Sequence, residues 1–304
     1  MAMNEEQQAR QGVFFALAAY LMWGIAPVYF KMLGNINPVE IICHRILWSF
    51  LLLAVLLHVG KQWPMIRNLL SDRRKIYYLI ATSVLIGGNW LIFIWAINNH
   101  HLLDASLGYY INPLLNVILG MVFLSERLRA LQWVAVALAT IGVMIQLILF
   151  GSIPVIAIAL ASTFGIYGLL RKKVMVSALN GLFIETLILV PVALIYLFGF
   201  ADSATSNLAD NSLYLNVLLA MAGVVTTLPL LCFAGAATRM KLSTLGFFQY
   251  IGPSMMFILA TVFYGEPFSP DKATTFLFIW GALILFSYDG IRNHRKRPVV
   301  VIEK

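Results

Sequence analysis

The stretch Tyr110–Leu128, YINPLLNVILGMVFLSERL, decides the fold because a second copy, YIGPSMMFILATVFYGEPF, occupies Tyr250–Phe268. Eight of the nineteen paired positions are identical. The identical pairs that are neither apolar nor aromatic are Pro113 with Pro253 and Glu126 with Glu266. Bulk hydrophobicity would not place a proline and a glutamate at matching positions. A repeat near half the chain length predicts two homologous halves, and paired proline-interrupted segments in a membrane protein indicate a binding site between them.

The composition places the chain in a lipid bilayer. Of its 304 residues, 61% are hydrophobic and only 11% are charged, far from the averages of soluble domains. Ten apolar runs are long enough to cross a hydrocarbon core of about 30 Å as helices, and none alternates in polarity like a barrel strand. We therefore expect an all-α membrane protein with ten transmembrane helices. The predicted spans are 12–30, 39–59, 76–97, 102–124, 131–150, 153–170, 181–200, 213–237, 243–264 and 273–290.

The distribution of positive charge predicts the orientation in the membrane. In this topology, 18 of the 21 lysine and arginine residues fall on the side of the two termini, and only Lys31 and Lys272 fall on the other. Positively charged residues stay cytoplasmic in short loops, so both termini are expected in the cytoplasm. The net charge of +8 is thus a topology signal, and since basic and aromatic residues do not interleave we expect no nucleic-acid partner.

The repeat unit covers five predicted spans. Trp23-Gly24 in the first span is echoed by Tyr167-Gly168 in the sixth. An odd number of crossings per unit starts the second copy from the opposite side, so the predicted fold is two inverted five-helix repeats. The expected segments are a cytoplasmic N-terminal segment (1–11), a first repeat (12–150), a second repeat (151–290) and a cytoplasmic basic tail (291–304).

The fourth and ninth spans carry polar side chains that suit a cavity. Asn112 and Asn116 are four residues apart and share one helix face, with Tyr109 and Tyr110 nearby. Pro113 removes a backbone donor and weakens the helix one turn earlier. The ninth span repeats the pattern with Gln249, Tyr250 and Pro253. Prolines also bend helices that contact only lipid, but their recurrence in both halves favours a cavity whose walls bend at these points.

Two other spans add candidate cavity residues. Asn89, beside Trp90 in the third span, needs a hydrogen-bond partner inside the membrane. It therefore either joins two helices or faces a wet cavity. In the eighth span Thr226 precedes Pro229, which is a third candidate kink, and the threonine hydroxyl could also bond back to its own helix.

Charged residues within spans are costly and need an explanation. Arg45, next to His44 in the second span, either extends to the outer headgroups or serves as counter-ion to an anionic substrate group. Glu185 in the seventh span is either the partner of Arg171 or Lys172 or a proton-coupling carboxylate. The expected depths place Arg45 and Glu185 about 15 Å apart, which opposes a salt bridge between them.

Common enzyme motifs are absent. The sequence has no GxxxxGK[ST] phosphate loop, no HExxH and no GxSxG. The adjacent histidines at 100 and 101 have no companion ligands, so we expect no metal, no other cofactor and no enzyme. Two alternatives to transport stay open. A membrane scaffold or assembly factor would pack its halves without a cavity, and an intramembrane enzyme would need His44 and Glu185 within hydrogen-bond reach.

Six stretches carry a resemblance to a known family: GGNWLIFIWAINN, SLGYYINPLLNVILGMVFLSERL, FGIYGLLRK, GLFIETLIL, GVVTTLPLL and STLGFFQYIGP. From about residue 12 to 290 the chain resembles the RarD-type branch of the EamA family, in the drug/metabolite transporter superfamily. The resemblance implies ten helices in two inverted repeats, the bacterial cytoplasmic (inner) membrane, and export of small organic molecules. This branch carries the label chloramphenicol-sensitive protein.

The resemblance also implies a central cavity built from spans one, three, four, six, eight and nine. The residues it would include are Trp23, Asn89, Trp90, Tyr109, Asn112, Tyr167, Thr226 and Tyr250. Spans two and seven would lie toward the periphery, which favours a gating or structural role for Arg45 and Glu185.

These features predict a secondary carrier for small molecules such as amino acids or drug-like compounds. Substrate would enter a cavity between the halves, contact aromatic and amide side chains at mid-membrane, and leave when the halves rock about their pseudo-two-fold axis. The kinks at Pro113 and Pro253 are the expected bending points. A coupling ion stays open, with Glu40, His44 and Glu185 as the protonatable groups at depth.

Overall fold

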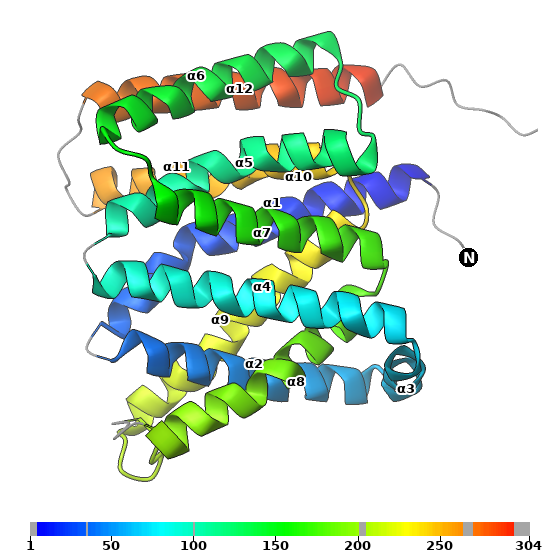
Figure 1. Cartoon of the computed structure of the whole chain (residues 1–304), viewed down its shortest axis with the longest axis vertical. Coiled ribbons are helices and arrows are strands. Elements are labelled where there is room, and N and C mark those ends of the chain that lie inside the picture. The colour runs from blue at the N-terminus through cyan, green and yellow to red at the C-terminus, as the bar shows by residue number, and fades with distance from the viewer. Residues whose placement is uncertain (1–4, 35, 100, 201–204, 264–269, 295–304) are drawn as a thin grey trace, which may run out of the picture.

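The structure is a computed structural model that describes residues 5–34, 36–99, 101–200, 205–263 and 270–294. Glu266, His100 and most of the predicted basic tail lie outside these residues. Every regular element in the described part is helical, and the long helices lie side by side in one bundle (Figure 1). The elements are α1 (Glu5–Met32), α2 (Pro38–Val59), α3 (Trp63–Ser71), α4 (Arg73–Asn98), α5 (Leu102–Leu124), α6 (Ala130–Phe150), α7 (Val155–Val174), α8 (Ala178–Ile195), η1 (Tyr196–Phe200), α9 (Leu213–Ala237), α10 (Leu242–Gln249), α11 (Ile251–Ile258), η2 (Leu259–Phe263) and α12 (Pro270–His294).

Nine helices in the described residues are long and apolar enough to cross a membrane, and they coincide with nine of the predicted spans. The remaining span, 243–264, is predicted as one helix, and this prediction is wrong in detail. It consists of α10, α11 and the π-helical turn η2, with a break at Tyr250. With this broken segment, the bundle accounts for the ten predicted crossings.

The two repeat prolines have different effects on their helices. Pro253 cannot donate to the carbonyl of Gln249, and α10 ends at that residue. Gly252, a poor helix former, precedes it. In the first half Pro113 follows Asn112, whose side chain is hydrogen-bonded to α7, and α5 runs through the proline without a break. Kinks are predicted at both prolines, but the structure has a helix break only next to Pro253.

The helix starts keep the spacing of the sequence repeat. α2 begins at Pro38 and α8 at Ala178, which are 140 residues apart like the two repeat tyrosines. The side chains of Asn37 and Ser177 each accept a hydrogen bond from an N–H group in the first helical turn. Matching caps therefore start matching helices in the two halves.

The contacts between the halves are symmetric under exchange of the repeats. The counterparts in the two halves are α1 and α7, α2 and α8, α4 and α9, α5 and α10–α11, and α6 and α12. The contact of α5 with α7 therefore matches that of α10 and α11 with α1. In the same way, α1 with α9 matches α7 with α4, and α2 with α9 matches α8 with α4. The pairs α2 with α8, α5 with α10 and α6 with α12 are their own counterparts. At the 140-residue spacing Arg45 and Glu185 are equivalent positions that carry opposite charges.

Equivalent helices run in opposite directions. In Figure 1 α1 runs leftward from the N-terminus whereas α7 runs rightward, and α5 and α10 are likewise antiparallel. Consistent with this, Glu126 just after α5 accepts a hydrogen bond from the N–H of Leu242 at the start of α10. The halves are therefore inverted, as predicted. We call the end of the bundle where α1 begins and α12 ends the terminal face, and the other end the distal face.

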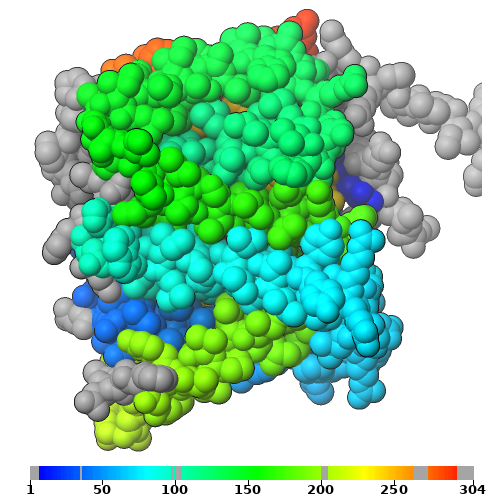
Figure 2. Space-filling model, in the orientation of Figure 1, coloured from blue at the N-terminus to red at the C-terminus, as the bar shows by residue number. Residues whose placement is uncertain are grey.

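The outer surface of the bundle is apolar along its length. Figure 2 shows α4, α5, α6 and α7 covering one face. Exposed side chains on these helices include Val84, Leu91, Ile118, Ile148 and Ile158. The basic connector after α2 also holds the short helix α3 on the terminal face, with Ile66 and Leu69 buried. This short helix lies outside the ten predicted spans.

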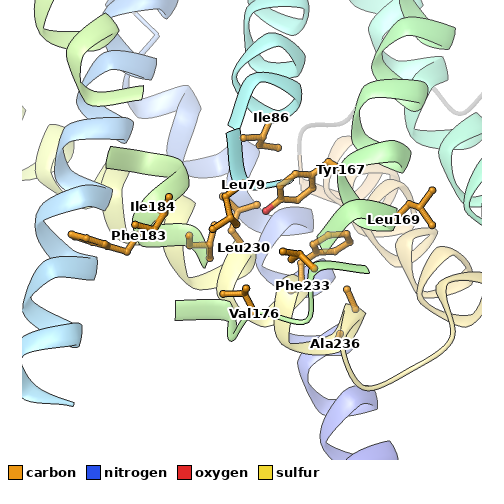
Figure 3. Close-up of a cluster of buried hydrophobic side chains, with 14 of the residues drawn as sticks. Leu79, Ile86, Tyr167, Leu169, Val176, Phe183, Ile184, Leu230, Phe233 and Ala236 are labelled. Carbon is orange, nitrogen blue, oxygen red and sulfur yellow. The ribbon is translucent and has the colours of Figure 1, made fainter. Parts of the chain in front are cut away.

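The core lies toward the terminal face, among α1, α4, α7, α8 and α9. Figure 3 shows Leu230, Phe233 and Ala236 of α9 gathered near Tyr167 of α7, with Leu79 of α4 beside them. Lipid tails are as apolar as these side chains, so close packing rather than exclusion from water favours their association in a membrane. This packed region forms the floor of the site described next.

Candidate functional site

A cavity of about 220 Å³ lies where the two halves meet. Seven crossings contribute to its wall: α1, α2, α4, α5, α7, α9 and the broken segment α10–α11. Its polar residues are Arg45, Asn89, Asn112, Thr226 and Gln249, and its aromatic residues are Tyr20, Trp23, Phe30, Trp90, Phe93, Tyr109 and Phe164. The remaining residues on the wall are apolar or glycine, including Pro253 and Gly252.

The wall contains seven of the residues predicted to line a cavity: Trp23, Asn89, Trp90, Tyr109, Asn112, Thr226 and Gln249. Six of the seven contributing crossings are those that the family resemblance implies. The seventh is α2, which was expected at the periphery but contributes Arg45. The position of α2 is therefore a correction, and it changes the interpretation of Arg45.

A chain of amide groups connects three helices beside the cavity. The Asn112 side chain donates to the carbonyl of Ala161 in α7 at 2.8 Å. The Asn116 side chain donates to Asn112 at 2.9 Å and to Gln249 in α10 at 3.3 Å. Asn116 is itself buried behind the wall. The amides on the wall are thus held in place by a partner one turn deeper.

Asn89 both lines the cavity and joins two helices. Its amide nitrogen donates to the carbonyl of Leu160 at 2.9 Å and to the hydroxyl of Thr163 at 2.8 Å. Both acceptors belong to α7. The two interpretations of this residue are therefore compatible, because its donors bind α7 while the side chain forms part of the wall.

Arg45 points into the cavity. Its Nε donates to the hydroxyl of Thr226 at 2.7 Å. Its guanidinium carbon lies 4.8 Å from the ring centre of Trp90 and 5.3 Å from that of Phe30, so the cation stacks on aromatic walls. The alternative in which Arg45 extends to the outer headgroups is wrong for this conformation, because two aromatic rings and a threonine hold it inside.

Glu185 is fully interior and paired with Arg171. Arg171 Nη1 lies 3.3 Å from Glu185 Oε1, and the two side chains are 0% and 2% exposed. Thr82 donates to the same carboxylate at 2.6 Å and the hydroxyl of Tyr167 at 3.3 Å. Glu185 therefore pairs with Arg171, one of the two partners considered for it, and a proton-coupling role for its carboxylate stays a prediction. Lys172 instead donates to main-chain carbonyls at the end of α9.

Tyr167 does not reach the cavity wall. Its ring stacks on Phe233 at 6.0 Å and its hydroxyl faces Glu185. Phe164, one helical turn earlier, lines the cavity in its place. Residues three positions apart on a helix lie one above the other on the same face. The match between Trp23 and Tyr167 therefore predicts the correct face of α7, but the residue on the wall is one helical turn away.

Tyr110 and Tyr250 lie away from the cavity. The Tyr250 hydroxyl donates to the carbonyl of Tyr110 at 3.2 Å, and the Tyr110 ring contacts Phe276 of α12. Tyr109 faces the cavity instead. Neighbouring residues on a helix point about 100° apart, so adjacent tyrosines cannot share one wall. The recurring tyrosines therefore join the halves to each other in this conformation.

Of the remaining predicted positions, only Pro253 is on the described wall. Pro253 lines the cavity, whereas Pro113 and Pro229 do not. His44 Nε2 lies 3.0 Å from the hydroxyl of Thr205. The same hydroxyl donates to Glu40 Oε2 at 2.5 Å. His44 and Glu185 have different partners and do not form the pair that an intramembrane enzyme would need.

An aromatic cluster closes the cavity toward the terminal face. We call it the aromatic plug; its members are Tyr20, Trp23, Phe164, Tyr167 and Phe233. The ring centres of Phe164 and Phe233 are 5.1 Å apart, and those of Trp23 and Phe164 are 5.8 Å apart. Three of these residues, Tyr20, Phe164 and Phe233, are not among the predicted cavity residues. Helical spacing from Trp23 and Tyr167 could have indicated Tyr20 and Phe164, which lie three residues before them.

The terminal face is held shut by contacts between the halves. The Glu126 carboxylate accepts from the N–H of Leu242 at 2.7 Å, from the N–H of Ser243 at 3.0 Å and from the Ser243 hydroxyl at 2.7 Å. A carboxylate is favourable at a helix N-terminus because of the unsatisfied donors and the helix dipole. Lys241 adds a bond to the carbonyl of Arg127 at 3.1 Å. We call these contacts the terminal latch.

Glu126→Gln is expected to loosen the terminal latch, because the amide lacks the negative charge that binds the start of α10. Leu245, one turn further along α10, is fully buried. A cysteine introduced at Leu245, in a chain whose two natural cysteines are replaced by alanine, should react several-fold faster with a soluble maleimide when Glu126→Gln is added. Asp72→Asn removes an exposed carboxylate from the same face and should leave the rate unchanged. Equal rates in all three proteins would show that Glu126 does not hold the face closed.

Comparisons with known proteins agree with this architecture. Residues 10–148 match the model of the EamA-like transporter family. A solved structure, described only as the crystal structure of a protein, has a TM-score of 0.70 at 14% identity and covers 92% of this chain and 98% of that chain. That likeness shows the fold alone. Together with the apolar bundle surface, these findings define an integral membrane transporter.

Curated relatives match over nearly the whole chain. Protein RarD of Salmonella typhimurium is 58% identical over 293 residues, covering 96% of this chain and all of that protein. An uncharacterized transporter of Vibrio cholerae is 62% identical over 288 residues, 95% of each chain. The chloramphenicol-sensitive protein RarD of Pseudomonas aeruginosa is 31% identical over 291 residues, 94% of this chain and 97% of that one. The chain belongs to the EamA-like transporter family, in the branch whose members are named RarD.

Proposed function

We propose that this protein is a secondary transporter that exports small organic metabolites by alternating access. The observation that carries the proposal is the cavity between the inverted halves, with wall residues from both. Inverted repeats with a site at their interface are the architecture on which many secondary carriers operate. The location is the bacterial cytoplasmic membrane, with both termini in the cytoplasm.

The distribution of contacts along the bundle supports alternating access. The cavity residues occupy the distal part of the bundle, whereas the aromatic plug and the terminal latch seal the terminal part. With cytoplasmic termini, this arrangement is a conformation closed to the cytoplasm. Rocking of the halves would separate α5 from α10 at the latch, and the helix break at Tyr250 supplies a pivot next to the cavity.

A membrane scaffold is the other candidate function, and no specific observation favours it. A scaffold has no need of a cavity lined by amides, a guanidinium and stacked aromatic rings. Convergent polar groups among aromatic walls instead suit a small solute. The cavity volume of about 220 Å³ is below the roughly 300–1,000 Å³ of drug-sized sites, which favours a small substrate.

Filling the cavity tests the proposal. Gly252 lies on the wall, and a Cβ atom added there would meet no atom within 4 Å. Gly252→Phe should therefore fold and block the cavity. Cells that overproduce the parent should release metabolites that deletion cells retain, as measured by untargeted mass spectrometry of medium and cell extract. Cells with Gly252→Phe should resemble the deletion.

The matched control is Gly88→Phe, the same change at another position with no atom within 4 Å but off the cavity wall. It should keep the metabolite profile of the parent. Equal release by parent and Gly252→Phe cells, at equal amounts of protein in the membrane, would contradict transport through this cavity. No difference between parent and deletion cells would favour the scaffold.

A further inference from the structure

Arg45 presents unused hydrogen-bond donors to the cavity. Within the described residues, Nε is the only side-chain nitrogen of Arg45 with a hydrogen-bond partner, the hydroxyl of Thr226 at 2.7 Å. The two terminal nitrogens carry the remaining N–H donors of the guanidinium. Trp90 and Phe30 cover the guanidinium from their ring faces and supply no acceptor atoms. A charged group in a membrane normally has a counter-ion, so this arrangement leaves a position for one.

The cavity wall, as far as the structure describes it, holds no carboxylate to fill that position. Among the described residues that line the cavity, Arg45 is the only charged one. Glu40, on the same helix, accepts hydrogen bonds from the N–H and the hydroxyl of Thr205. Glu185 is paired with Arg171. Both acids are therefore engaged elsewhere, and the described residues of the wall carry one net positive charge.

The bond to Thr226 also sets the geometry in which an anion can bind. With Nε occupied, the two terminal nitrogens form an end-on fork that matches the two oxygens of a carboxylate. A dianionic phosphate would need a second cation, which the described wall does not provide. The ammonium group of an amino acid would need a carboxylate partner, and none is among the described residues of the wall. The single positive charge of Arg45 and its one pair of terminal nitrogens therefore favour a ligand with one negative charge.

The rest of the wall indicates what the anion is attached to. Trp23 and Phe164 meet edge to face at 5.8 Å on the floor of the cavity, and Phe93 meets Tyr109 at 6.3 Å on another side. Flat aromatic surfaces favour a flat or branched apolar body. The amide groups are largely occupied by helix-to-helix bonds and offer few sites for a strongly hydroxylated solute.

Resting on the transport function proposed above, we propose that the substrate is a small organic monocarboxylate with an apolar, preferably aromatic, body. Its carboxylate binds the terminal nitrogens of Arg45, and its body lies among the rings of Trp23, Trp90 and Phe164. Arg45 is thus a substrate-binding residue that determines charge specificity, and Thr226 positions it.

A series of probes of equal shape tests this assignment on the purified full-length protein in detergent. The probes are 3-phenylpropionate, its neutral amide, the cationic 3-phenylpropylamine and zwitterionic phenylalanine, with binding measured by calorimetry. The carboxylate should bind at least about tenfold more tightly than the amide, because a charge-assisted pair replaces a neutral bond. The amine should bind most weakly, because the guanidinium repels it.

Variants assign the preference to one side chain. Arg45→Gln should abolish the preference for carboxylate over amide, and Arg45→Lys should restore part of it because the charge returns without the fork. Arg67→Gln, the same change at an exposed position on α3, should bind like the parent. Retained binding of the neutral amide would show that Arg45→Gln is folded.

Several outcomes would overturn the inference. They are equal binding of carboxylate and amide by the parent, a carboxylate preference that survives Arg45→Gln, tighter binding of phenylalanine than of phenylpropionate, and no binding of phenylpropionate at millimolar concentration. Each can occur while Gly252→Phe still blocks metabolite release. In that case the transport function would stand and only the substrate class would be wrong.

Discussion

Glu185→Leu is expected to lower the free energy of unfolding by about 3–5 kcal/mol, the usual effect of leaving a buried charge without its partner. Arg171 is completely buried, and its Nε already has no hydrogen-bond partner among the described residues. After the substitution its remaining bond would be the one to the carbonyl of Ala178 at 3.4 Å. Unfolding of the detergent-solubilised protein, followed by tryptophan fluorescence, measures the change.

The double variant Arg171→Leu/Glu185→Leu is the informative control. Replacing both members of a buried ion pair by apolar residues is often neutral, so most of the lost stability should return. Thr82 and Tyr167 would each lose an acceptor, which leaves a smaller residual loss. A double variant no more stable than Glu185→Leu alone would contradict this account. The stability would then depend on the carboxylate's bonds to Thr82 and Tyr167 rather than on its pairing with Arg171.

Gly223→Ala is expected to destabilise the protein by about 1–3 kcal/mol or more through overpacking. A Cβ at this position would lie 2.5 Å from the carbonyl carbon of Trp48 and 2.8 Å from the nitrogen of Ser49. These are backbone atoms of α2, so the clash cannot be relieved by a side-chain rotation. The helices would have to separate by a fraction of an ångström or more, which loses the bond from Ser49 to the carbonyl of Gly223.

The separation would also affect the cavity. Thr226 lies one turn beyond Gly223 on α9, and Arg45 lies one turn before Ser49 on α2, so the close crossing keeps donor and acceptor together. Gly88→Ala is the matched control, because its Cβ would meet nothing within 4 Å. Because alanine has a higher helix propensity than glycine, this variant should be stabilised by up to about 1 kcal/mol. Equal melting temperatures for the two alanine variants would contradict the close-crossing explanation.

Much of the fold follows from the sequence alone because the decisive signals are local. The positions of nine spans follow from the lengths of the apolar runs. The inversion follows from the odd number of spans in the repeat unit. The matching helix caps at Asn37 and Ser177 illustrate the repeat itself. The break at Tyr250 does not follow in the same way. Pro113 and Pro253 recur at matching positions, but Asn112 before the first is hydrogen-bonded to α7, whereas Gly252 before the second is a poor helix former.

The sequence predicts which helices line the candidate site, but not the depth along each helix at which a side chain reaches the cavity. Asn89, Trp90 and Thr226 are on the cavity wall, whereas Tyr167 is one turn too deep. Position along a span is uncertain by a few residues when only apolar length marks its ends, and one helical turn is enough to move a side chain out of a cavity. The role of these residues in binding stays a prediction that the cavity and Arg45 variants test.

Arg45 illustrates the remaining limit. A charge count identifies it as unusual, but whether it extends to headgroups or to a cavity depends on the neighbours of α2. Contacts between α2 and α9 are long-range, and no local pattern encodes them. The same applies to Phe233, which is an ordinary apolar residue in sequence and a member of the aromatic plug in the structure.

The opposite charges at the equivalent positions 45 and 185 have an evolutionary consequence. A hybrid built from two copies of the first half would place an arginine at position 185 and would lose Arg171, which belongs to the second half. One built from two copies of the second half would replace Arg45, the only charged residue on the described part of the cavity wall, by a glutamate. Neither hybrid could reproduce both sites. If the two halves arose by duplication of a five-helix gene, the ancestral dimer had identical residues at these positions. The separate roles of Arg45 on the cavity wall and Glu185 in the buried ion pair then arose after the duplication.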